Sequence, residues 1–153
     1  ARVIVTSSSD LKLERARALG AWQMINYRAC PDWGREVRRL TDGDGVDLVV
    51  DVGGAGTLEQ AMSACRFGGQ ISFIGVLAGQ SLEINTVPIV MKRLRVQGVF
   101  VGHRESFERM NRAIEEHQLR PAVSRIFPLH ETREALEHLA AGGHFGKVCI
   151  RIG

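Results

Sequence analysis

The chain has 153 residues, of which 44% are hydrophobic and 24% charged, and its formal net charge is +3 at pH 7. This composition is ordinary for one globular domain and excludes disordered and collagen-like classes. Apolar runs are a few residues long, well short of the roughly 20 that cross a bilayer, and no signal-peptide pattern is present. From these two features we expect a cytoplasmic protein that does not bind membranes. Because basic residues are scattered among acidic ones, we expect no nucleic-acid partner.

The chain opens with a strand and a helix. The β-branched stretch at 1–7 predicts a strand, and residues 10–19 predict a helix that begins after the N-cap Ser9 and ends at Gly20. Four apolar residues are expected largely on one side of this helix: Leu11, Ala16, Ala18 and Leu19.

The same alternation continues to the end of the chain. Further strands are expected at 22–27, 46–52, 70–76, 94–101 and 146–152. Helices are expected at 32–41, 57–65, 104–117 and 130–141, with a short segment at 87–93. The strand at 46–52 is apolar almost throughout, which is typical of a strand with helices on both faces. The alternation predicts an α/β fold with a parallel sheet, because helical crossovers connect parallel neighbours.

Ligands of such sheets bind beyond the carboxyl ends of the strands, so the residues after each strand are candidates for a site. The stretch "VVDVGGAGTLEQA" at 49–61 has the outline of a dinucleotide-binding fingerprint, but Glu59 stands where GxGxxG has its third glycine. The next strand, 70–76, also lacks the acid that would hold a ribose. Two interpretations stay open: a tight turn that needs glycine, with Thr57 and Gln60 as a capping box, or a supporting contact to a ligand.

The end of the first strand offers phosphate-binding chemistry. Hydroxyl groups, a helix N-terminus and an ammonium group come together in "TSSSDLK", which contains Thr6, Ser7, Ser8, Ser9 and Lys12. Asp10 places a negative charge in the same turn and argues against phosphate binding. The other interpretation is a serine that only caps the helix.

Metal-binding and catalytic motifs were sought separately. The three cysteines and five histidines have no metal-ligand spacing, and "HETRE" at 130–134 lacks the second histidine of HExxH. We therefore assign neither a metal site nor a catalytic residue to this chain.

Three stretches together resemble the C-terminal half of the medium-chain dehydrogenase/reductase superfamily, in its zinc-type alcohol dehydrogenase and quinone oxidoreductase group. They are "VIVTSSSDLKLERARALGAWQMINYR", "GVDLVVDVGGAGTLEQAMSACRFGGQISFIGVLAG" and "HFGKVCIRIG". The resemblance implies a Rossmann-like sheet that lacks its first strand–helix unit, with a partial dinucleotide-binding domain at 1–120 and a segment at 121–153 that returns toward a catalytic domain. Two strand edges, at 2–6 and 47–52, would then stay unpaired beside the place of the missing central strand.

The resemblance also implies a function. The chain would be the cofactor-binding half of an oxidoreductase that transfers hydride between a nicotinamide dinucleotide and an alcohol, aldehyde, ketone or quinone, and it would be inactive alone. The small-molecule substrate, and zinc if present, would bind the missing domain. A homodimer through residues 94–101 is expected. If the chain is complete as given, the alternative is a non-catalytic nucleotide-binding or assembly module.

The family's cofactor contacts fall on particular residues of this sequence. NADP(H) is favoured over NAD(H), because no acid ends the first strand. The adenosine ribose and its phosphate would meet Ser7, Ser8, Ser9, Lys12 and Tyr27, although Tyr27 is equally consistent with an aromatic cover of the sheet end. Gly53 and Gly54 would lie beneath the ribose and pyrophosphate. Main-chain contacts to the nicotinamide would come from Ile74, Gly75, Val76, Phe100 and Val101.

Overall fold

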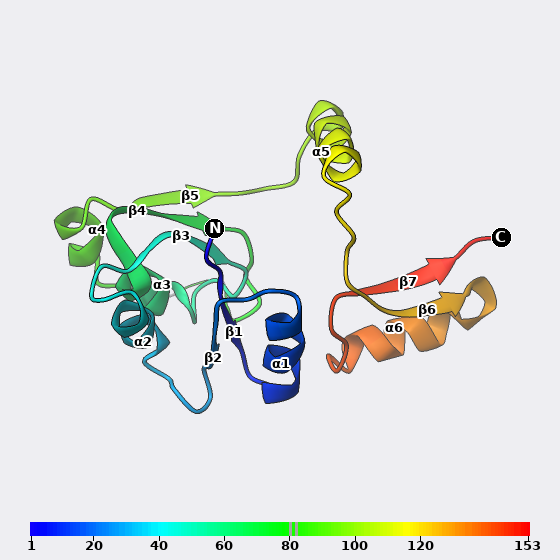
Figure 1. The fold of residues 1–153 in the computed structure, drawn as a ribbon, viewed down its shortest axis with the longest axis horizontal. Coiled ribbons are helices and arrows are strands. Elements are labelled where there is room, and N and C mark those ends of the chain that lie inside the picture. Colours follow the sequence, from blue (N-terminus) through cyan, green and yellow to red (C-terminus); the bar gives the residue numbers. More distant parts are fainter. Residues whose placement is uncertain (80, 82) are drawn as a thin grey trace. The chain divides into compact units, whose positions relative to one another are not determined.

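The computed structural model describes residues 1–79, 81 and 83–153. Over these residues the chain divides into two compact units, Ala1–Val101 and Gly102–Gly153 (Figure 1). The expected assignment of 1–120 to a cofactor domain and of 121–153 to a returning segment stays a prediction.

Strands and helices alternate through the first unit. Its strands are β1 (Ile4–Ser7), β2 (Gln23–Asn26), β3 (Val46–Asp51), β4 (Cys65–Phe73) and β5 (Arg95–Gly98). Its helices are α1 (Asp10–Ala18), α2 (Trp33–Leu40), α3 (Leu58–Ala64) and α4 (Val87–Met91). β1 pairs with β2 in one sheet and β4 lies between β3 and β5 in another, and all these pairs are parallel. The predicted α/β class with a parallel, Rossmann-like arrangement is confirmed.

Helix α1 begins and ends as predicted, but a different side of it is buried. The Ser9 hydroxyl accepts a hydrogen bond from the Lys12 N–H, and Gly20 has a positive φ of 97° just beyond the helix. Leu13 and Ala16 are the buried residues of α1. The predicted apolar side is therefore wrong for Leu11, Ala18 and Leu19, which are exposed. Leu11 and Ala18 lie on the side of the helix opposite to Leu13, given 100° per residue.

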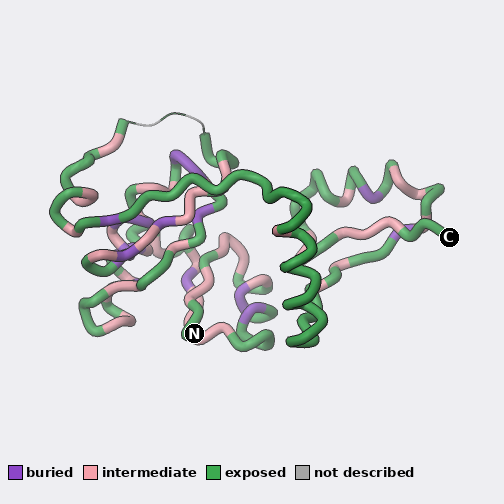
Figure 2. The backbone as a smooth tube through the Cα atoms, turned by 90° about the horizontal axis from the view of Figure 1, so that it is seen from above, coloured by how far each residue is buried: buried purple, intermediate pink, exposed green. Residues whose placement is uncertain are grey.

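The core of the first unit lies between α2, α3 and the strands. One buried cluster contains Ala61, Met62, Cys65, Ile71 and Leu94, and another contains Ile25, Val37 and Ala64. Trp33 and Val49 pack against both clusters. The second cluster joins α2 and α3 to β2 and β3. Figure 2 shows the buried positions in purple along these elements.

β1 and β3 each have a hydrogen-bonded neighbour on one side. In the part of the chain that the structure describes, β1 pairs with β2, β3 pairs with β4, and the two sheets do not join. This is the pattern expected for a sheet that lacks a strand between them. Leu48, Val50 and Val52 are exposed, so the prediction that helices cover both faces of β3 is wrong for the described residues. Helices α2 and α3 cover the face that carries Val49.

A lysine that follows α4 caps the end of α3. The Lys92 ammonium donates to the carbonyl oxygens of Met62 at 2.9 Å, Ser63 at 2.9 Å and Cys65 at 3.1 Å. Burial, together with the charge of Arg38, lowers the pKa of Lys92. The three carbonyls lie at the negative end of the α3 dipole and favour the charged lysine. Burial also raises the pKa of the Cys65 thiol to about 11, so this thiol is protonated and unreactive at neutral pH.

The second unit contains α5 (Arg104–Glu116), β6 (Val123–Pro128), the short 3-10 helix η1 (Leu129–Glu131), α6 (Thr132–Ala140) and β7 (Lys147–Arg151). β6 and β7 are parallel, and Phe127 and Ala135 are buried. Strand β6 was not predicted; it pairs with β7, where Ile126 is the partner of Cys149 much further along the chain. The helices and the last strand that the sequence predicts for the second unit are confirmed. None of the described helices combines the length and apolar character needed to span a membrane.

Helices α2 and α3 approach each other closely at Gly34. The Gly34 N–H donates to Gln60 Oε1 at 2.8 Å. A Cβ added at Gly34 would overlap the Gln60 carbonyl oxygen and lie 2.7 Å from the Ser63 Cβ. Glycine is usually unfavourable inside a helix, but here its lack of a side chain permits the contact.

We predict that Gly34→Ala destabilises the chain. The helix-propensity gain is about 1 kcal/mol, whereas forcing a methyl group into a packed contact costs about 1–3 kcal/mol. We therefore expect a net loss of about 1 kcal/mol in the free energy of unfolding, measured by urea denaturation. Gly143→Ala is the control, because Gly143 has open space around it and no positive φ. Equal stability of Gly34→Ala and wild type would contradict the close contact.

Candidate cofactor-binding site

Parallel pairing places the carboxyl ends of neighbouring strands at one edge of each sheet. Ser7 is paired with Asn26 at the ends of β1 and β2, and Asp51 with Phe73 at the ends of β3 and β4. The predicted site residues consequently lie in two groups. The first contains Ser7, Ser8, Ser9, Lys12 and Tyr27, and the second contains Gly53, Gly54, Ile74, Gly75 and Val76.

In the first group, the loop between β1 and α1 is held by its own serines. The Ser7 hydroxyl oxygen accepts from the Ser9 N–H at 3.2 Å, and the Ser9 hydroxyl oxygen accepts from the Lys12 N–H at 3.4 Å. A hydroxyl that accepts one hydrogen bond still has its own proton to donate. Ser7 and Ser9 can therefore shape this loop and also donate to an anion.

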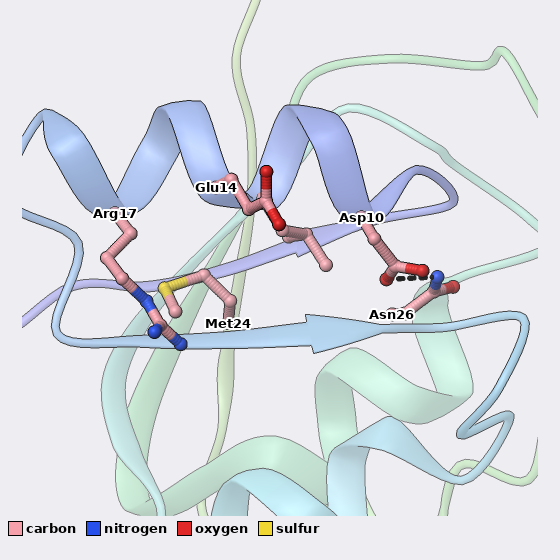
Figure 3. Close-up of a pocket in the computed structure, with 6 residues that line it drawn as sticks. Asp10, Glu14, Arg17, Met24 and Asn26 are labelled. Carbon is pink, nitrogen blue, oxygen red and sulfur yellow. Dashed lines mark hydrogen bonds between the residues drawn. The ribbon is translucent and has the colours of Figure 1, made fainter.

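The end of β2 lies beside this loop. The Tyr27 N–H donates to the Ser7 carbonyl oxygen at 3.1 Å, and 43% of the Tyr27 surface is exposed. Asn26 Nδ2 donates to Asp10 Oδ1 at 2.7 Å, which joins the end of β2 to the first turn of α1 (Figure 3). Beneath this bond, α1 and β2 line a groove of about 280 Å³ that also contains Glu14, Arg17 and Met24.

In the second group, a buried carboxylate organises the turn after β3. Asp51 is 5% exposed, and its Oδ1 accepts from the N–H of Gly53 at 2.9 Å, the N–H of Gly54 at 3.0 Å and the Thr57 hydroxyl at 2.7 Å. Its Oδ2 is buried and has no hydrogen-bond partner among the described residues. The predicted capping box is wrong, because the Thr57 hydroxyl binds Asp51 and Gln60 binds Gly34.

The loop after β4 packs directly against this turn. The Ile74 N–H donates to the Asp51 carbonyl oxygen at 2.8 Å, and the Ala78 N–H donates to the Gly53 carbonyl oxygen at 2.7 Å. Gly54 has a φ of 90°, and a Cβ there would lie 2.6 Å from the Gly75 carbonyl oxygen. Of the two interpretations of this glycine stretch, the structure favours the tight turn, since both the φ and the close approach require glycine.

The remaining predicted residues lie at or beyond strand ends. Ile74 and Val76 follow β4 and are exposed. Phe100 and Val101 were expected within a strand, but β5 ends at Gly98, and they are 91% and 78% exposed. The last hydrogen bond that joins this region to β4 runs from the Val99 N–H to the Phe73 carbonyl oxygen at 2.9 Å.

The donor set fits a dinucleotide better than a metal ion. Hydroxyls and Lys12 at the start of α1, together with a glycine turn, can hold phosphate and ribose oxygens. Among the described residues, no three His, Cys, Asp or Glu side chains lie close enough to hold a metal ion. His103 instead caps α5 by accepting from the Ser106 N–H, and the ring of His138 lies between those of Phe127 and His144.

Sequence reasoning missed two residues of this site. Asp51 ends an apolar strand directly before the glycines, and an acid at that position is a signal for a buried carboxylate that holds the turn. Asn26, next to Tyr27, was not predicted as a site residue. An asparagine side chain at a strand end often forms a hydrogen bond with the backbone two residues further along the chain. Asn26 does so, because its Oδ1 accepts from the Arg28 N–H at 3.0 Å.

Parallel strands whose carboxyl ends are followed by a serine-rich loop and a glycine loop define a domain of the dinucleotide-binding class. Comparison with known proteins gives the family. The family model described as "Zinc-binding dehydrogenase" matches residues 1–116. The chain belongs to this family, within the medium-chain dehydrogenase/reductase superfamily that the sequence resembles, so the predicted resemblance is confirmed.

Individual relatives are longer than this chain. A zinc-type alcohol dehydrogenase-like protein of Schizosaccharomyces pombe is 38% identical over 156 residues, which cover 99% of this chain and 45% of that protein. The crystal structure of an NAD-dependent alcohol dehydrogenase is 37% identical with a TM-score of 0.86, covering 100% of this chain and 44% of that one. A mycobacterial structure complexed with NADPH shares the fold at 22% identity and a TM-score of 0.81, covering 99% of this chain and 50% of that one. The chain thus spans about half the length of these relatives, or less.

We predict that Asp51→Ala destabilises the chain strongly. The substitution leaves three donors without their acceptor, and hydrogen bonds to a charged group contribute about 1.5–3 kcal/mol each. We expect a loss of more than about 4 kcal/mol in the free energy of unfolding, measured by denaturant titration. Asp47→Ala is the matched control on the same strand, because Asp47 is highly exposed and forms a surface ion pair with Arg66. A small and equal effect of both substitutions would refute the role given to Asp51.

Proposed function

We propose that this chain is the cofactor-binding half of an NADP(H)-dependent oxidoreductase. The enzyme would transfer hydride between the nicotinamide and an alcohol, aldehyde, ketone or quinone. The observation that carries the proposal is the pairing of β1 with β2, which brings the serine loop and Tyr27 to one edge. The class of oxidoreductase follows from the family, whereas the cofactor and substrate are inferred.

The preference for NADP(H) rests on the residues at the end of β1. An enzyme that prefers NAD(H) places an acid there to accept from the ribose 2′-hydroxyl, but this chain has Ser7. Ser7, Ser8 and Ser9 offer hydroxyl donors, α1 presents its N-terminus, and Lys12 stands in its first turn. These groups suit a 2′-phosphate. One relative is an NAD-dependent enzyme by name, so the cofactor has to be argued from these residues rather than from the family.

The rest of the cofactor would follow the carboxyl edge. Gly53 and Gly54 would lie beneath the ribose and pyrophosphate, held in shape by Asp51. The main chain at Ile74, Gly75 and Val76, and that at Phe100 and Val101, would flank the nicotinamide. Tyr27 would line the 2′-phosphate or adenine pocket.

Catalysis divides between this chain and the rest of the enzyme. The bound nicotinamide supplies the hydride chemistry, and these residues bind and orient it. The substrate, and zinc if the enzyme uses it, would be held by a domain outside residues 1–153, so this chain alone would be inactive. Residues 1–120 would form the cofactor domain and 121–153 would return toward the catalytic domain. We place the enzyme in the cytoplasm.

We predict that the full-length protein binds NADPH at least tenfold more tightly than NADH, because a phosphate held by an ammonium and hydroxyls contributes about that much. Lys12→Glu should lower this preference about tenfold, since it replaces an attractive charge with a repulsive one. Titration of nicotinamide fluorescence measures both constants. The control is Lys147→Glu, a matched charge reversal at an exposed residue of the second unit. Equal dissociation constants for NADPH and NADH in the wild type would overturn the cofactor assignment.

We also predict a homodimer formed through residues 94–101. In the described chain β5 pairs with β4 on one side, and its residues Arg95–Gly98 are all exposed. An edge of this kind can pair with a second copy of itself. Sedimentation of the wild type at micromolar concentration should show a dimer. Val96→Lys should shift the protein to a monomer. The control Leu136→Lys, at an exposed position of α6, should leave the dimer intact. A wild-type monomer would contradict the prediction.

A further inference from the structure

Asp10 poses a problem for a phosphate site at the start of α1. It is the first residue of the helix and directly follows Ser9. A carboxylate that faced the serine loop would repel a bound phosphate. The orientation of the Asp10 carboxylate therefore decides whether a phosphate can bind here.

The Asp10 carboxylate is held on the side of β2 by Asn26. Asn26 Nδ2 donates to Asp10 Oδ1 at 2.7 Å (Figure 3), and Asn26 Oδ1 accepts from the Arg28 N–H at 3.0 Å. The two bonds fix the orientation of the amide, because a carboxylate can only accept and an N–H can only donate. One side chain thus joins the first turn of α1 to the backbone just beyond β2.

This bond spans two strand ends that already lie side by side. Ser7 and Asn26 are partners in the β1–β2 register, and the Tyr27 N–H donates to the Ser7 carbonyl oxygen. The bond therefore holds the Asp10 carboxylate against Asn26 at the end of β2. Asn26 also holds the backbone N–H of Arg28, two residues further along the chain.

We propose that Asn26 is a positioning residue that sets selectivity for a 2′-phosphorylated adenosine. It donates to one oxygen of the Asp10 carboxylate and so fixes where that negative charge lies, and it accepts from the backbone N–H of Arg28. The inference rests on the proposed function, because it assumes that the serine loop binds the 2′-phosphate. It adds the residue that makes an acid at the start of α1 compatible with that phosphate.

The closing experiment uses the full-length protein and two probes that differ by the 2′-phosphate, 2′,5′-ADP and 5′-AMP. The measured quantity is the ratio of their dissociation constants, obtained by calorimetry. A loss of folded protein weakens both probes equally and leaves the ratio unchanged, so the ratio separates positioning from stability. The wild type should bind 2′,5′-ADP at least tenfold more tightly, given the charge-assisted contacts.

Asn26→Asp should lower the ratio about tenfold, because two adjacent carboxylates repel and drive Asp10 from its place. Asp10→Asn keeps an acceptor for Asn26 and removes the charge, so its ratio should equal or exceed that of the wild type. The double variant Asp10→Asn with Asn26→Asp restores a carboxylate–amide pair and should recover most of the ratio. Glu14→Gln is the control, since Glu14 lines the same groove without bonding to Asn26, and its ratio should stay within about twofold.

Three outcomes would overturn one or both of these statements. A wild-type ratio near one would overturn the proposed NADP(H) function and this inference with it. A high wild-type ratio that Asn26→Asp leaves unchanged would overturn only the role of Asn26. A double variant as weak as Asn26→Asp would also refute the inference, because it would show that the charge of Asp10 is not what the amide controls.

Discussion

Parallel pairing of the strands is the constraint on which this site depends. Two consecutive strands can lie parallel only if the chain crosses back over the sheet, and α1, α2, α3 and α4 make these crossings. Within each of the two sheets of the first unit, the described strands consequently run in the same direction. The loops that leave the strands meet at the carboxyl edge, so residues as distant in sequence as Gly54 and Gly75 come into contact. The site is a consequence of the chain direction before any side chain contributes chemistry.

Within that edge, Asp51 links the two loops of the second group. Its carboxylate fixes the turn at Gly53 and Gly54, and its carbonyl oxygen accepts from Ile74. The glycines are needed for the backbone to reach this shape, which explains why "GGAG" imitates a dinucleotide fingerprint. Both a phosphate-binding loop and a tight strand-to-helix turn require glycine where a positive φ or a close approach occurs. The spacing of glycines alone therefore cannot separate them, whereas the acid before them and the Glu59 after them can.

Local patterns in the sequence predicted most of the fold. Apolar periodicity and caps such as Ser9 depend on neighbours within one turn, so they identified every helix and most strands. What failed depends on distant parts of the chain. β6 is stabilised by pairing with β7, the buried side of α1 is set by where β1 and β2 lie, and the Thr57 hydroxyl turns to Asp51 because that carboxylate is buried beside it. The predicted strand 94–101 extends past Phe100, but β5 ends earlier, because its pairing with β4 ends at Gly98.

The candidate site was predictable in its chemistry and less so in its connections. Hydroxyls and a lysine after a strand could be interpreted directly as phosphate donors, and the structure places them around the start of α1, where their role as donors stays a prediction. The role of Asp10 could not be read, because a carboxylate in the first helical turn has the same sequence signature whether it faces a ligand or a neighbouring strand. Only the pairing of β1 with β2 brings Asn26 to Asp10. In the proposed site, selectivity would thus depend on two adjacent strand ends taken together, and a substitution on β2 would change how an acid on α1 acts on a ligand.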